Sequence, residues 1–192
     1  MSKSIPKILL LIGMSLLVCG AYAQSNYKNK QAKISVSGTS TMHDWESEVT
    51  SVECTGQVKI DDNKLVELKN VSVNIPVTSI KSTKGKIMDN KTYEAFKHEK
   101  YPNISFKLSS AKISGNGPDY SIDASGTLTM AGTSVPIELN SKAKLSPSGD
   151  LQITGSKTLD MTKFKMEPPT AMMGTIKVGE EVTVKFDITL TK

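Results

Sequence analysis

Apolar and polar residues alternate along most of this chain. Such period-2 alternation, with turn residues between the runs, is typical of antiparallel strands that have one apolar face. The apolar face predicted in this way consists of Ile34, Val36, Val52, Cys54, Gly56, Val58, Ile60, Tyr120, Ile122, Ala124, Gly126, Leu128, Met130, Val135, Ile137, Leu139, Ala143, Leu145, Leu151, Ile153, Leu159, Val178, Val182, Val184, Phe186, Ile188 and Leu190.

One run changes its parity. Val66 and Leu68 stand at even positions, whereas the apolar residues from Val71 to Val77 stand at odd positions. A slip of one residue would turn the apolar face of the strand outward. We therefore predict an extra residue, a β-bulge, near Lys69 and Asn70.

The stretch from Met88 to Pro102 breaks the strand pattern. Asp89 or Asn90 can cap the start of a helix, and Pro102 ends it. We predict one short helix over about residues 89–98. Tyr93, Phe96 and Lys97 would share one of its faces.

About eight strands of about ten residues each, with one inserted helix, predict an all-β fold in one domain. In an antiparallel eight-stranded β-barrel, side chains fill the interior or leave room for one small ligand. A two-sheet sandwich is the alternative, because it produces the same alternation.

The first residues resemble an export signal. Lys3 and Lys7 precede an apolar run, Ile8 to Val18, and Ala21 and Ala23 provide the small residues of a cleavage site. Cleavage after Ala23 would give a signal peptide, 1–23, and a domain, 24–192. We expect an exported protein, periplasmic or extracellular, with no transmembrane segment in its mature chain. A lipoprotein anchor at Cys19 is the alternative, disfavoured by the β-branched Val18 before it.

The formal charge is +5, and all 24 basic residues are lysine. Recognition of bases or phosphates usually relies on arginine, so nucleic acid is not expected as a partner. Removal of Cys19 would leave Cys54 without an internal disulfide partner. We expect Cys54 to be a small buried residue of a strand; a catalytic thiol would require a nearby histidine.

Four segments in register resemble a known family. They are "TSTMHDW", "IKSTKGKIMDNKTYEAFKHEKYPNISF", "GTLTMAGTSVPIELN" and "MEPPTAMMGTIKVGEEVTVKFDITL", which together cover the chain from about Lys33 to Lys192. The sequence is similar to the YceI-like family, the lipocalin-like polyisoprenoid-binding proteins that bacteria export.

The resemblance implies a lipocalin-like barrel that carries a long isoprenoid chain, such as a polyprenyl phosphate or a quinone tail, in an apolar channel. It also implies a link to acid or osmotic stress and gives no reason to expect an enzyme or a cofactor. A homodimer is compatible with the sequence. Two alternatives remain: a hydrolase or isomerase that acts on a lipid in the same channel, and a structural or stress protein without a ligand.

His43 precedes Asp44 and Trp45. A catalytic pair of His43 with Asp44 is disfavoured because neighbouring side chains on a strand point to opposite faces. A metal site built from His43, Asp44, His98 and Glu99 would lack any usual ligand spacing, so no metal is expected. We expect His43 and Trp45 to close one end of the channel instead.

Methionine and lysine supply the remaining candidates. Methionine is flexible and fits irregular apolar ligands, so the Met-rich segment 161–173 is either a lid against a lipid tail or ordinary packing. Lysine can bind a phosphate, which makes Lys81, Lys84 and Lys86 candidates for a lipid head group. The candidates for the channel and its mouth are His43, Trp45, Met88, Phe96, Tyr101, Phe106, Met161, Phe164, Met166, Met172, Met173 and Phe186.

Overall fold

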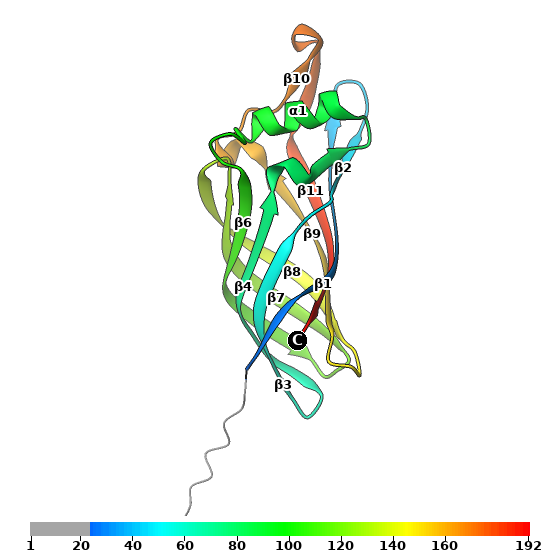
Figure 1. Cartoon of the computed structure of the whole chain (residues 1–192), viewed down its shortest axis with the longest axis vertical. Helices are drawn as coiled ribbons and strands as arrows, with labels where there is room; N and C mark the ends of the chain where they lie inside the picture. Colours follow the sequence, from blue (N-terminus) through cyan, green and yellow to red (C-terminus); the bar gives the residue numbers. More distant parts are fainter. Residues whose placement is uncertain (1–23) are drawn as a thin grey trace, which may run out of the picture.

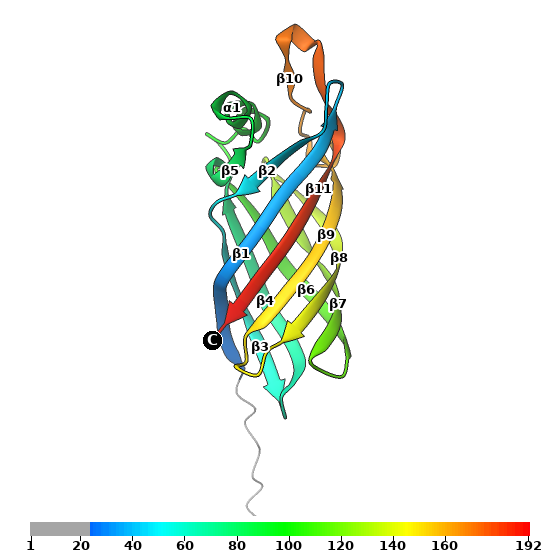
Figure 2. The same cartoon turned by 90° about the vertical axis from the view of Figure 1, so that its right-hand side faces the viewer.

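The computed structural model describes residues 24–192, and the predicted signal peptide, its cleavage site and Cys19 lie outside them. Eight strands form a closed antiparallel ring in the order β1-β3-β4-β6-β7-β8-β9-β11, and β11 pairs back with β1 (Figures 1 and 2). The fold is the predicted barrel and not the sandwich. Its strands are β1 (Ser25–Ser40), β3 (Glu53–Asp61), β4 (Lys64–Pro76), β6 (Asn103–Gly115), β7 (Asp119–Met130), β8 (Thr133–Leu145), β9 (Leu151–Asp160) and β11 (Ile176–Thr191).

Shorter elements gather at one end of the elongated barrel (Figure 1). The helix α1 (Lys86–Ala95) lies across this end, and a projection from β10 and β11 rises on its other side (Figure 2). The remaining elements are β2 (Trp45–Val49), β5 (Ile80–Ser82), β10 (Thr170–Ala171) and the 3-10 helices η1 (Val77–Ser79), η2 (Met161–Phe164) and η3 (Met172–Gly174).

The predicted β-bulge lies in β4. Gln57 of β3 pairs with Lys69 and Thr55 pairs with Ser72, so β4 has one residue more than β3 between these pairs. Asn70 has a φ of 51°, a left-handed conformation that asparagine tolerates better than most residues. The extra residue keeps Val71, Val73 and Ile75 on the inner face.

The helix begins three residues earlier than predicted. It spans Lys86–Ala95, and Gly85 stands at its N-cap position without a side-chain hydrogen bond. Asp89, the expected cap, is buried inside the helix, where its Oδ1 accepts a hydrogen bond from the Ser82 backbone N–H at 2.7 Å. Asp89 therefore fastens α1 to β5, an interaction across seven residues that helix-capping rules do not capture.

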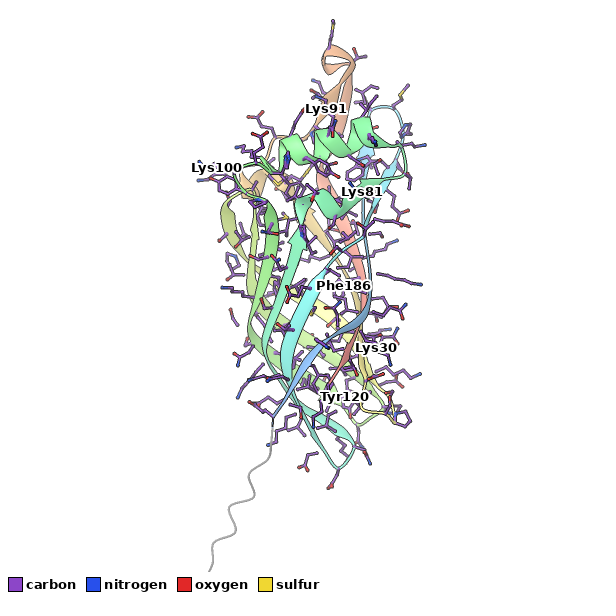
Figure 3. The ribbon with its side chains drawn as sticks, viewed as in Figure 1. Lys30, Lys81, Lys91, Lys100, Tyr120 and Phe186 are labelled. Carbon is purple, nitrogen blue, oxygen red and sulfur yellow. The ribbon has the colours of Figure 1, made fainter. Side chains whose placement is uncertain are left out.

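The barrel contains two connected apolar regions. One includes Tyr27, Leu65 and Tyr120, of which Tyr120 lies near the end opposite α1 (Figure 3), and the other includes Val77, Met161 and Phe164 and packs against Tyr93 and Ala95 of α1. At the lower end the Tyr120 hydroxyl accepts a hydrogen bond from the Leu65 backbone N–H at 3.0 Å and thereby joins β7 to β4 (Figure 3). This end of the barrel is packed with side chains, and the hollow part lies above it.

Candidate functional site: an apolar cavity under the helix

A cavity of about 450 Å³ lies inside the barrel and reaches the end at which α1 lies. This volume is within the range of pockets that hold small ligands, about 300–1,000 Å³. Most of its walls are apolar side chains from the inner faces of the strands, as the alternation predicted. These include Ile34, Val36, Leu68, Val71, Val73, Ile75, Ile104, Leu108, Ile122, Leu128, Leu139, Ile153, Leu159, Val182, Val184, Ile188 and Leu190.

The large rings near the cavity lie on glycines of neighbouring strands. A Cβ atom on Gly155 would come within 2.6 Å of Phe186, which is its direct partner across β9 and β11. Phe106 lies in the same way against Gly126, and Trp45 lies against Gly38. Because glycine leaves room beside the backbone, each ring can lie against the wall, and the lumen stays open.

Figure 3 shows Phe186 in the middle of the barrel and Tyr120 near the lower end. Phe186, Phe106 and Trp45 all line the cavity. The cavity extends from below Phe186, where Ile188 and Leu190 line it, upward to α1, where Met88, Lys91 and Phe96 also line it.

His43 and Trp45 lie where the β1–β2 connection borders the mouth. The exposed His43 ring has its Nδ1 2.9 Å from the backbone oxygen of Asp44 and, within residues 24–192, forms no hydrogen bond or ion pair with the Asp44 carboxylate. The Trp45 indole N–H donates to the Thr39 carbonyl at 3.1 Å. Both side chains line the cavity, and their polar atoms interact with nearby backbone.

The structure brings nine of the predicted residues together around this cavity: His43, Trp45, Lys84, Met88, Phe96, Phe106, Met161, Met166 and Phe186. Phe164 is buried in the core beside it, and Met173 is fully exposed. Tyr101 lies against Gly132 and, like Lys81 and Lys86, is not among the lining residues. The side chain of Met172 lies outside the part of the chain that the structure describes.

The three candidate lysines differ in their surroundings. The Lys81 Nζ donates to the Tyr93 hydroxyl at 2.6 Å and lies 3.8 Å from the Asp89 carboxylate. The hydrogen bond to Tyr93 and the charge of Asp89 raise the pKa of Lys81. Lys81 thus links β5 to α1 (Figure 3), whereas Lys84 faces the cavity mouth.

Sequence reasoning missed two lining lysines, Lys91 and Lys157. Lys157 shares its parity with Ile153 and Leu159 in β9, and this was a readable signal that it faces inward. Lys91 lies on the face of α1 that also carries Met88, Thr92 and Ala95, whereas the sequence indicated a face with Tyr93, Phe96 and Lys97.

Cys54 is buried in the cavity wall, and burial raises the pKa of its thiol to about 11. A thiol with such a pKa remains protonated at neutral pH and is a poor nucleophile.

Among residues 24–192, no group of three or more His, Cys, Asp or Glu side chains is placed to hold a metal ion. In the same part of the chain, no helix is long and apolar enough to cross a membrane.

The fold and the cavity place this protein in the class of closed antiparallel β-barrels with an apolar cavity in the lumen. The sequence then identifies its family. The YceI-like domain matches residues 23–190, and the chain belongs to this family. No curated protein matches the chain.

Three solved structures share the fold. A polyisoprenoid binding domain from Saccharophagus degradans, described as implicated in plant cell wall breakdown, is 10% identical over 85% of this chain and 97% of that chain, with a TM-score of 0.66. BcnA of Burkholderia cenocepacia is 18% identical over 84% and 96%, with a TM-score of 0.62. The YceI protein of Campylobacter jejuni is 19% identical over 76% and 84%, with a TM-score of 0.57.

Proposed function

We propose that this protein binds and carries a long apolar lipid of the isoprenoid type, such as a polyprenyl phosphate or a quinone tail, without catalysing a reaction. The observation that carries the proposal is the apolar cavity, which is open toward α1 and packed with side chains at the other end. A preformed apolar cavity binds a hydrocarbon chain because both surfaces leave water together. The polyisoprenoid-binding description of one structural relative agrees with this ligand class.

Mass spectrometry of an organic extract of the purified protein tests the proposal. We expect one class of long-chain lipid in the extract. Ala124→Phe, which puts a ring into the cavity from β7, should lower the amount of bound lipid, whereas Asp123→Phe on the outer face should not. An extract without lipid, from protein expressed in its own host, would count against a carrier and favour the ligand-free alternative.

The second candidate is a hydrolase or isomerase that uses the same cavity. Against it stand the protonated state of Cys54 and the contact of His43 with a backbone carbonyl. His43→Ala should reduce stability or lipid retention and abolish no chemical activity. A hydrolytic turnover that disappears in this variant, while lipid binding persists, would favour the enzyme.

The proposal includes export to the periplasm or beyond, with cleavage after Ala23. N-terminal sequencing of the mature protein distinguishes Gln24 as the first residue from a lipid-modified Cys19.

The molecular mass in solution tests the homodimer that the sequence allows. A role in acid or osmotic stress belongs to the same proposal, and growth of a deletion strain at low pH and high osmolarity tests it.

A further inference from the structure

The cavity lining contains positive charge and no acidic side chain. Its basic side chains are Lys84, Lys91, Lys157 and His43, and no Asp or Glu lines it. Lys91 has a partner in Glu94, 3.0 Å away on α1. The side chain of Lys157 forms no hydrogen bond or ion pair with any other residue from 24 to 192. A lysine beside an apolar cavity without a counterion favours an anionic ligand.

Lys157 belongs to the wall and not to the mouth. It faces inward from β9 between Gly155 and Leu159, and its direct partner on β11 is Val184, which also lines the cavity. Gly155 is the partner of Phe186, in the middle of the barrel (Figure 3). Since β9 runs toward the end with α1, Lys157 lies two residues, about 7 Å along the strand, beyond Gly155 in the direction of α1.

The hydrogen-bond ladder of the barrel is interrupted beside Lys157. Pairing between β8 and β9 ends at Ser141 and Gly155, so beyond this pair β9 continues beside β11 alone. The β8 segment from Thr133 to Asn140 pairs with β7 only. Lys157 is the second residue of β9 after the two strands separate, and it is half-buried. The separated edges let water reach the ammonium group while the aliphatic stem lines the lumen.

We propose that Lys157 binds the anionic head group of the ligand inside the barrel wall, so that the cavity selects chains with an acidic end. This inference rests on the proposed function. Below Lys157 the walls are mostly apolar, with Ile122, Ile153 and Ile188 among them, and the apolar chain occupies this part. Carboxylate and phosphate heads share the required chemistry, an anionic oxygen that accepts hydrogen bonds from the ammonium group.

Three probes of equal chain length test this assignment: a long-chain fatty acid, the monoalkyl phosphate and the alcohol. They are bound to the mature protein after a lipid-adsorbing resin has removed its own ligand. Lys157→Met keeps the stem and removes the charge. It should weaken binding of the acid and the phosphate about tenfold and leave the alcohol unchanged. A greater loss for the phosphate than for the acid would indicate a phosphate as the natural head group.

Lys185→Met is the matched control. Lys185 is exposed on the outer face of β11, next to the partner of Lys157, so this variant removes the same charge without touching the cavity. It should leave all three affinities within about twofold. The assignment is wrong if Lys157→Met binds the acids as the parent does, if it loses the alcohol equally, or if Lys84→Met alone shows the acid-specific loss. A parent protein that binds none of the probes would overturn the proposed function as well.

Discussion

Phe186 occupies the space that a side chain at Gly155 would need. Adding one methyl group there forces the phenyl ring of Phe186 away from the wall and into the lumen. The backbone of β9 cannot move aside instead, because it is paired with β11 in a closed barrel. At the scale of single residues, the width of the cavity therefore depends on glycines that carry no functional group.

The variant Gly155→Ala tests this dependence. We expect it to remain folded, with a loss of about 1–3 kcal/mol in the free energy of unfolding from overpacking, and to retain less lipid. Chemical denaturation and lipid extraction measure the two effects. The double variant Gly155→Ala with Phe186→Ala should recover lipid binding, since the displaced ring is absent. Unchanged lipid content in the single variant would show that Phe186 does not limit the cavity.

Cys54 makes the free energy of unfolding depend on pH. Burial raises the pKa of its thiol from 9.0 to about 11, so the folded protein holds this proton more tightly than the unfolded chain does. Below pH 9.0 both states keep the proton and the thiol has no effect. Between the two pKa values the unfolded chain loses the proton first, and stability falls as pH rises, by at most about 1.4 kcal/mol per pH unit.

The comparison with Cys54→Ala isolates this contribution. The difference in free energy of unfolding between the parent and the variant should be constant up to pH 9.0 and should shrink above it. Denaturant titrations at successive pH values measure it. Two curves that stay parallel up to pH 11 would mean that the thiol ionises alike in both states.

At the scale of elements, the bulge in β4 determines which face of the strand is apolar. Asn70 has a positive φ, and its side-chain amide donates to Gln57 Oε1 at 2.7 Å. Asn70→Val puts a β-branched residue into this conformation and should cost about 1–3 kcal/mol of stability. Asn70→Gly keeps the backbone conformation and should lose only the exposed hydrogen bond, so its denaturation midpoint should stay close to that of the parent. Equal loss in both variants would assign the effect to the amide and not to the backbone.

The sequence predicts strands better than it predicts the helix, for a physical reason. Inward and outward residues of a barrel strand alternate strictly, so the inner face and even the extra residue near Asn70 could be read directly. The predicted start of α1 assumed that Asp89 caps the helix, whereas its carboxylate accepts a hydrogen bond from the Ser82 backbone N–H of β5. Which of these two nearby roles the Asp89 carboxylate takes leaves no pattern in the sequence.

At the candidate site, too, some residues could be predicted from the alternation and others could not. Phe186, Phe106 and Trp45 follow from the alternation, and the structure places them at the cavity. Lys157 has the right parity too, but a lysine on an apolar face makes physical sense only once β8 and β9 are known to separate beside it. Phe164 belongs to the core because η2 folds back on β8 and β11, which the sequence does not reveal.

At the scale of the whole molecule, the hollow barrel lacks part of the packing that a filled core provides. A ligand that binds only the folded state adds stability that grows with its concentration. Removing the co-purified lipid should therefore lower the Tm, and adding it back should restore it; at a hundredfold excess over Kd the gain is about 2.7 kcal/mol. Calorimetry of loaded, stripped and reloaded protein measures this effect, and an unchanged Tm would place the lipid outside the barrel.

Closure of the ring between β1 and β11 has a consequence for how the protein forms. β1 is the first strand and β11, of 16 residues, is the last, so the pairing that closes the barrel joins residues at opposite ends of the described chain, such as Lys28 and Thr191. During synthesis the earlier strands have no closing partner, and their apolar faces remain open to other chains until the last strand emerges. A truncated chain that lacks β11 should accordingly aggregate as an open sheet with two free edges and not fold into a smaller barrel.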